Sequence, residues 1–141
     1  MSGKLLQRLK DASRSGVYCT RSVGPILDAT RDSGLDVVTI SLRGRSGPEA
    51  VLGALAEALA FPSWFGGTWD ALEDCLADLS WRPGGGRVLL LEGATPGDEA
   101  GILIDILSGS AEYWAGRGTS FFAVFVDPDG LLPLAQLFRE K

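Results

Sequence analysis

The chain has 141 residues and 45% hydrophobic content, which suits one globular domain, spanning 1–141, with a core of its own. Histidine is absent, and this excludes Ser-His and Cys-His nucleophilic catalysis as well as histidine-based metal sites. The formal net charge is −5, and the sequence contains no run of about 18 or more apolar residues that could cross a membrane.

Two further features bear on the cellular compartment. Residues 1–10 mix charged side chains with leucine and so do not form the apolar core of a signal peptide. Cys19 and Cys75 are far apart in the sequence and have no CxxC spacing, which favours two buried reduced thiols over a disulfide or a zinc site. We therefore expect a cytoplasmic protein without a metal or other cofactor.

Strands are indicated by three short and continuously apolar runs, at 37–42, 88–91 and 121–126. Because these runs do not alternate with polar residues, and because helical patterns separate them, they favour a small parallel sheet covered by helices, an α/β fold. In the N-terminal third, 16–19 suggests an extra edge strand and 25–33 a helix that leads into the first core strand.

The first core helix is expected to open at Ser46, with Pro48 in its first turn and Glu49 at capping-box spacing. Pro62 stops it, and an aromatic, glycine-containing loop follows at 64–67. The buried stripe of this helix is expected to consist of Val51, Leu52, Leu55 and Leu59.

Thr68 can cap a second helix, which we expect to end near Ser80 and Trp81. A third helix is expected over 98–115, with Gly116 as its stop, and 131–141 could form one more short amphipathic element. The apolar positions of the second helix are Trp69, Leu72, Leu76 and Leu79, and those of the third are Ile102, Leu103, Ile106, Leu107 and Trp114.

Charge is distributed unevenly along the chain. Residues 1–45 carry more basic than acidic side chains, whereas no Lys or Arg occurs between Arg45 and Arg82. Phosphates would be repelled by that acidic stretch, so direct nucleic-acid binding is disfavoured. The carboxylates within it are Glu49, Glu57, Asp70, Glu73, Asp74 and Asp78.

Four of these carboxylates, Asp70, Glu73, Asp74 and Asp78, lie on the polar face of the second helix and are called here the acidic ridge. Two pairs within it have i,i+4 spacing, and each like-charge pair destabilises a helix by about 0.2–0.5 kcal/mol. A solvated face of an acidic protein is one interpretation. A functional surface is the other interpretation, because the like-charge pairs lower the stability of the helix and no interaction within the helix compensates for that loss.

The loop before this helix strengthens the second interpretation. Trp64 and Phe65 precede two glycines that would allow another backbone to approach closely, and these aromatic residues stand beside the ridge. Aromatic anchors ringed by charge are typical of tight protein interfaces, although both rings could instead belong to the core.

A family resemblance emerges from the stretch 58–76, which reads ALAFPSWFGGTWDALEDCL. It resembles the signature of the barstar family, in which Leu-Pro, an aromatic pair, Gly and Asp-Ala-Leu-x-Asp-Cys-Leu occur in this order. The likeness continues with Trp81 and with a strand that ends in Leu91-Glu92. It implies a barstar-like core at about 36–127, an N-terminal extension at 1–35 and a tail at 128–141.

The function implied by the resemblance is that of an intracellular, non-enzymatic inhibitor of a barnase-like ribonuclease. In the family a loop aromatic, matched by Trp64, packs on the nuclease active site, and a close-approach glycine is matched by Gly66. Two aspartates, matched by Asp70 and Asp74, sit where substrate phosphates would lie and pair with Arg, Lys and His groups of the nuclease. The full set of expected partner-binding residues is Trp64, Phe65, Gly66, Thr68, Asp70, Glu73, Asp74 and Asp78.

Some positions depart from the family pattern and suggest a different partner nuclease. Thr68 replaces the usual asparagine, Trp69 is bulkier than the common leucine, and Glu73 stands where a tryptophan occurs in the best-known members. The family also has an acidic contact on the helix before the last strand, and here either Glu112 or Tyr113 could occupy that position.

Two other functions compete with the inhibitor. A magnesium-dependent phosphoryl-transfer enzyme could use Asp127 and Asp129, which follow an apolar strand, but Asp-Pro-Asp-Gly is also a favourable turn sequence. An interaction module with the same fold could instead bind another enzyme with a basic cleft. The sequence does not separate this second alternative from the ribonuclease inhibitor.

Overall fold

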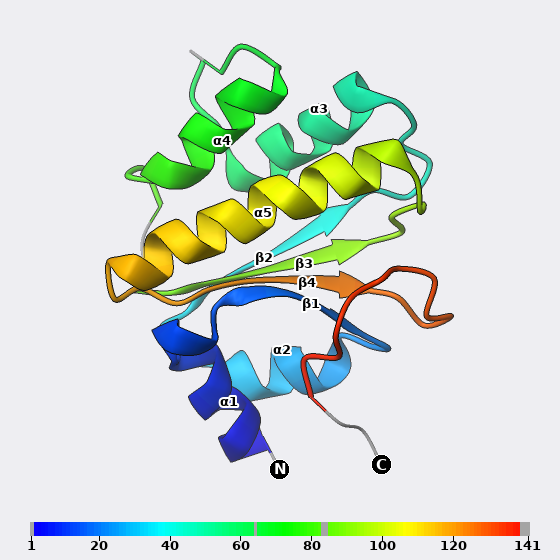
Figure 1. The fold of residues 1–141 in the computed structure, drawn as a ribbon. Coiled ribbons are helices and arrows are strands. Elements are labelled where there is room, and N and C mark those ends of the chain that lie inside the picture. Colours follow the sequence, from blue (N-terminus) through cyan, green and yellow to red (C-terminus); the bar gives the residue numbers. More distant parts are fainter. Residues whose placement is uncertain (1, 64, 83–84, 139–141) are drawn as a thin grey trace.

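The computed structural model describes residues 2–63, 65–82 and 85–138. Its described part contains an all-parallel sheet of four strands in the order β1-β4-β3-β2 (Figure 1). The expected α/β fold is thus confirmed, including the extra strand at one edge. The strands are β1 (Gly16–Thr20), β2 (Asp36–Ser41), β3 (Arg87–Glu92) and β4 (Phe121–Val126).

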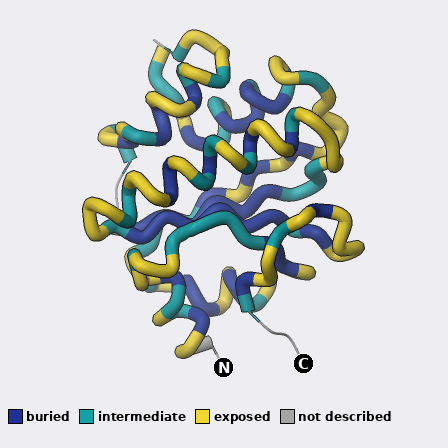
Figure 2. Tube along the Cα trace, viewed as in Figure 1, coloured by how far each residue is buried: buried dark blue, intermediate teal, exposed yellow. Residues whose placement is uncertain are grey.

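Helices cover both faces of the sheet, and this explains why β3 and β4 read as unbroken apolar runs (Figures 1 and 2). Leu89 and Leu91 of β3 face one layer of helices, while Val88 and Leu90 face the other. The first layer consists of α3 (Pro48–Leu59), α4 (Trp69–Asp78) and α5 (Asp98–Gly116), and the second of α1 (Ser2–Lys10) and α2 (Gly24–Thr30).

The N- and C-terminal segments meet on the second face of the sheet. Leu5 and Leu9 of α1 are buried in the same cluster as Leu137, and the Arg8 guanidinium donates a hydrogen bond of 2.7 Å to the Leu137 carbonyl. The tail is extended where it passes β1: the Cys19 N–H donates to the Ala135 carbonyl, and the Leu137 N–H donates to the Cys19 carbonyl. Both terminal segments therefore contribute to one shared core.

The start of α3 differs from the sequence expectation. Its N-cap is Gly47, not Ser46, and no side chain caps the helix, so the expected capping box is wrong. Gly47 has φ of 89°, a conformation that suits glycine, and the chain enters the helix only at Pro48. The expected buried stripe of Val51, Leu52, Leu55 and Leu59 is confirmed.

The buried face of α5 also differs in part. Leu103 and Leu107 are buried as expected, whereas Ile102 is 40% exposed. The buried side chains recur at helical spacing, and Ile102 points about 100° away from Leu103 around the helix axis. Small residues complete the buried face instead, namely Ala100, Ser110 and Ala111.

Both cysteines are free and buried, as expected. Burial raises the pKa of each thiol. Over the described ranges, none of the helices is both long and apolar enough to span a membrane.

Candidate functional site

The helix that carries the acidic ridge is fixed at both ends by local hydrogen bonds. The Thr68 hydroxyl accepts a bond of 3.1 Å from the Ala71 N–H, which confirms the expected N-cap. The helix ends at Asp78, slightly earlier than expected, because Leu79 adopts a left-handed conformation with φ of 49° and its N–H bonds to the Cys75 carbonyl. Burial of Leu72, Cys75 and Leu76 turns this side of α4 toward the core.

The opposite side of α4 presents the acidic ridge to solvent. Asp70, Glu73, Asp74 and Asp78 are all exposed. Within the described residues, the ion pairs formed by arginines involve Asp28, Asp36 and Glu57, and none involves a ridge carboxylate. The ridge is therefore exposed to solvent, and none of the arginines that the structure describes neutralises it.

The carboxylates of the ridge interact unfavourably with one another and, in part, with the helix itself. Asp70 lies in the first turn, where the helix dipole stabilises an anion, but Asp78 lies in the last turn, where an anion is destabilised. The field of the ridge extends into the core. Burial is the main cause of the raised pKa of the Cys75 thiol, and the charges of Asp74 and Asp78 raise it further.

Groups from neighbouring elements hold the C-terminal end of α4. The buried Arg87 side chain donates to the Leu79 carbonyl at 3.2 Å, and Trp114 of α5 donates its Nε1–H to the Leu76 carbonyl at 2.7 Å. The Arg87 guanidinium lies over the Trp114 ring, 5.6 Å from its centroid. A cation at this helix end opposes the partial negative charge of the last carbonyls.

Arg87 belongs to a polar cluster that we call the arginine anchor, composed of Asp36, Arg82 and Arg87. Arg82 forms a bidentate ion pair with Asp36, with N–O distances of 2.7 and 2.9 Å, and these hydrogen bonds raise the pKa of Arg82. Burial lowers the pKa of Arg87, and the charge of Asp36 opposes that shift. The Arg87 Nε is 3.7 Å from Asp36 and has no hydrogen-bond partner among the described residues.

The arginine anchor was not predicted from the sequence, although a signal for it exists. Asp36 and Arg87 each open an otherwise apolar strand, and the two residues are direct partners in the register of β2 and β3. Opposite charges at the first positions of two adjacent parallel strands predict such a contact.

The loop between α3 and α4 begins with a packed aromatic group. The Phe61 ring lies 4.9 Å from the Phe65 ring and 6.0 Å from the Trp81 ring, measured between centroids. The Trp81 Nε1–H donates to the Leu59 carbonyl at 3.0 Å. Phe65 is half-buried against the core, so its ring serves packing as well as any contact with a partner.

The rest of the loop is open beside α4. Gly66, Gly67 and Thr68 are exposed, and Gly67 has φ of 72°. Among the described residues, a Cβ at Gly66 would have the Ala71 Cβ, at 4.0 Å, as its nearest neighbour, so their packing does not require glycine there. The open space beside Gly66 would allow another backbone to approach closely, as expected from the sequence. Trp64, the other expected contact, lies outside the described residues.

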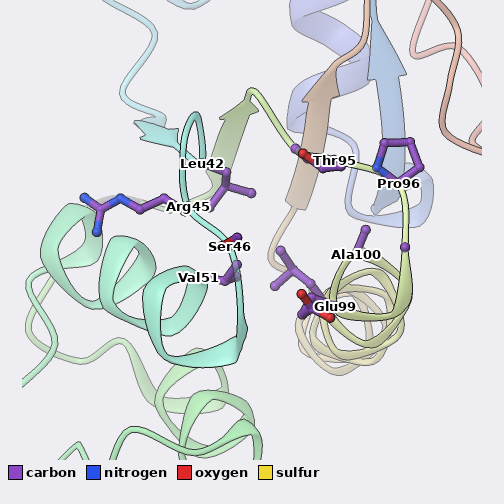
Figure 3. Close-up of a pocket in the computed structure, with 11 residues that line it drawn as sticks. Leu42, Arg45, Ser46, Val51, Thr95, Pro96, Glu99 and Ala100 are labelled. Carbon is purple, nitrogen blue, oxygen red and sulfur yellow. The ribbon is translucent and has the colours of Figure 1, made fainter.

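A pocket of about 150 Å³ lies at the carboxyl ends of β2 and β3, between the first turns of α3 and α5 (Figure 3). Leu42, Arg45, Ser46 and Val51 line one side of it, and Thr95, Pro96, Glu99 and Ala100 line the other. The loop before α4 follows the opposite end of α3. The pocket is thus separate from the acidic ridge.

The carboxylate of Asp127 has a structural role. It is buried, and its two oxygens accept hydrogen bonds of 2.9 Å from the N–H groups of Leu131 and Leu132. These bonds close the turn that follows β4, in agreement with the turn interpretation of Asp-Pro-Asp-Gly. Across the described residues, no three His, Cys, Asp or Glu side chains gather in a way that could hold a metal ion.

Together, the parallel sheet, the helix layer and the solvent-facing acidic helix define a small α/β protein with an exposed anionic helix face. The family model described as Barstar (barnase inhibitor) matches residues 35–126, which include β2, α3, α4, β3, α5 and β4. The chain therefore belongs to the barstar family, as the sequence resemblance implied. No curated protein matches the chain.

Proposed function

We propose that this chain is an intracellular inhibitor of a barnase-like ribonuclease and that it inserts the acidic ridge into the basic active site of that enzyme. The exposure of all four ridge carboxylates, together with their lack of arginine partners among the described residues, carries this proposal. Membership of a family described as barnase inhibitors supports a ribonuclease as the class of partner.

The mechanism is electrostatic replacement of the substrate. Ribonuclease active sites bind phosphates with cationic side chains, and Asp70 and Asp74 would present carboxylates to those same groups. Because α4 is capped at both ends and packed on the core, the backbone that carries the carboxylates is fixed before binding, which lowers the entropic cost of association. In a cell that makes the nuclease, such an inhibitor acts as an antitoxin.

The loop before α4 would complete the interface. Phe65, Gly66 and Thr68 adjoin the first turn of α4, and Trp64 takes part by family resemblance alone. Glu73 and Asp78 extend the ridge on either side of Asp74. Since Glu73 replaces the tryptophan of the best-known family members, we infer that the partner is a nuclease other than barnase itself or another enzyme with a basic cleft.

The experiment titrates barnase, as a probe with a basic active site, with the wild-type chain and with Asp74→Ala. The variant should bind at least about 30-fold more weakly by calorimetry, because truncating one partner of a buried charge pair costs about 2–5 kcal/mol. Circular dichroism should show an unchanged fold, since Asp74 is exposed.

The matched control is Asp105→Ala, which removes one exposed carboxylate from α5. It should change the affinity less than about threefold. Equal affinities for Asp74→Ala and the wild type would overturn the proposed use of the ridge. Absence of barnase binding by the wild type would count against a barnase-like ribonuclease as the partner and favour the second candidate, a module for another basic enzyme.

A further inference from the structure

An aromatic ring and a cation are exposed together at the end of α5. Tyr113 is 42% exposed, whereas most large hydrophobic side chains of the described chain are buried. The Arg117 guanidinium lies over the Tyr113 ring, 5.1 Å from its centroid, and Arg117 is itself exposed. Tyr and Arg are enriched among residues that dominate binding at protein interfaces.

This pair rests on a rigid support. The Trp114 ring meets the Tyr113 ring edge-on, with 5.3 Å between centroids and 86° between planes. Trp114 is fixed in turn by its hydrogen bond to the Leu76 carbonyl and by the buried Arg87 guanidinium above its ring. The positions of Tyr113 and Arg117 are therefore largely set before any partner arrives.

The same hydrogen bond places the pair near the C-terminal end of α4, the helix that carries the acidic ridge. It joins the last turns of α5 to the C-terminal half of α4, and the two helices lie alongside each other on one face of the sheet (Figure 1). Tyr113 and Arg117 are within one turn of Trp114, and Asp78 is within one turn of Leu76. A partner that covers the C-terminal half of the ridge and extends over the end of α5 would also reach Arg117.

Arg117 has a charge opposite to that of the ridge. Among the described residues it forms no ion pair, so its charge remains available to a partner. A surface that is basic throughout would be attracted by Asp74 and Asp78 and repelled by Arg117. Specific interfaces commonly combine an attractive element with a repulsive one that excludes wrong partners.

We propose that Arg117, held on the Tyr113 ring, is a specificity-determining residue that selects a nuclease whose basic cleft is bordered by a carboxylate on the side facing α5. This inference rests on the proposed function and adds the feature that distinguishes the partner from a uniformly basic enzyme. Arg117 acts against the uniformly basic enzyme by charge repulsion and favours the selected partner by an ion pair.

The test measures barnase binding to the wild type, Arg117→Ala, Arg117→Lys and Arg117→Glu at low salt. Barnase serves as the probe for a basic cleft. We expect Arg117→Glu to bind at least tenfold more tightly than the wild type and Arg117→Ala to lie between them. Arg117→Lys, which keeps the charge, should stay within threefold of the wild type.

A charge-matched control is Lys4→Glu, which makes the same change of charge on α1, in the helix layer on the other face of the sheet. It should alter the affinity less than threefold. An unchanged or weakened affinity of Arg117→Glu, or an equal gain from Lys4→Glu, overturns the inference. Asp74→Ala, measured in parallel, separates the two proposals: if it weakens binding while Arg117→Glu has no effect, only the role of Arg117 fails.

Discussion

At the level of single residues, the arginine anchor is the most consequential polar feature of the interior. Asp36 and Arg82 have side chains that are 9% and 19% exposed, and Arg87 is 6% exposed. The Asp36 carboxylate is therefore the ion-pair partner of two buried or partly buried guanidinium groups. Removal of one partner from a buried ion pair leaves an uncompensated charge, which is far more costly than the loss of an exposed pair.

Asp36→Ala should accordingly lower the free energy of unfolding by about 3–5 kcal/mol, measured by urea denaturation. Asp28→Ala provides the comparison, because its ion pair with Arg31 is highly exposed, and such pairs contribute about 0–1 kcal/mol. Similar small losses for both variants would show that the anchor does not stabilise the fold.

The buried thiols predict a pH dependence of stability. Because the pKa of Cys19 and that of Cys75 are raised in the folded chain, the folded protein keeps both thiols protonated at a pH where the unfolded chain ionises. Their contribution to stability is thus fully present below the unfolded thiol pKa of about 8.5 and is lost as the pH rises through the higher folded values.

Urea denaturation at a series of pH values between about 7 and 10 checks this prediction, with the unfolded thiol pKa near 8.5 as the reference. The free energy of unfolding should fall over that range, and Cys75→Ala should show a shallower fall than the wild type. The two proteins are compared by how steeply their free energy of unfolding falls with pH. The absolute values differ in any case, because the alanine variant also loses packing of the buried side chain. Parallel slopes for the two proteins would contradict the assignment to Cys75.

At the level of elements, the N-cap of α4 sets where the acidic helix begins. Thr68→Ala removes the side-chain acceptor for the Ala71 N–H and should cost about 0.5–2 kcal/mol of stability, whereas Thr68→Ser should retain most of it. Thr95→Ala is the matched control because the N-cap of the nearby α5 is Gly97. Thermal unfolding that shows no difference between Thr68→Ala and Thr95→Ala would contradict this role.

The predictability of the elements followed the strength of their apolar patterns. β3 and β4 were predictable because both faces of these strands are buried, and α4 because Thr68 precedes an apolar stripe at helical spacing. The helix α1 was not recognised, since Leu5 and Leu9 are separated by polar residues and become buried only against α2 and the distant tail. Such long-range packing leaves little local signal.

One part of the candidate site could be predicted from the sequence and another could not. The order of acidic residues on α4 predicted their shared exposed face, because helical spacing alone fixes it. The position of Arg117 near the C-terminal end of α4 could not be predicted, since it depends on the packing of α5 against α4 through Trp114 and Leu76. The start of α3 was misjudged because a positive φ at Gly47 delays the helix by one residue.

At the level of the whole molecule, residues before and after the family match complete the fold. The match spans 35–126, yet α1, α2 and the tail cover the face of the sheet formed by Val88, Leu90, Phe122 and Val124, and β1 adds an edge strand to it. We infer that the described chain folds as one domain. Two cores share one sheet, so neither face is stable in water without its own layer of helices.

A single substitution tests this coupling. Leu9→Ala, in α1, should lower the free energy of unfolding by about 2–5 kcal/mol because Leu9 is fully buried under the sheet. The variant should still unfold in one transition when monitored by circular dichroism and by tryptophan fluorescence. Two separate transitions would show that the N-terminal segment folds independently of the family core.

The overall charge arrangement gives the most direct test of the central claim, that the acidic ridge docks into a cationic cleft. Stopped-flow measurement of the association rate constant with barnase, at increasing salt, reports the attraction between opposite fields, which is screened within about 8 Å at physiological ionic strength. We predict a steep fall of the rate constant with salt for the wild type and a shallower fall for Asp74→Ala. A rate constant that does not change with salt, or slopes that are equal for the two proteins, would contradict docking through the ridge.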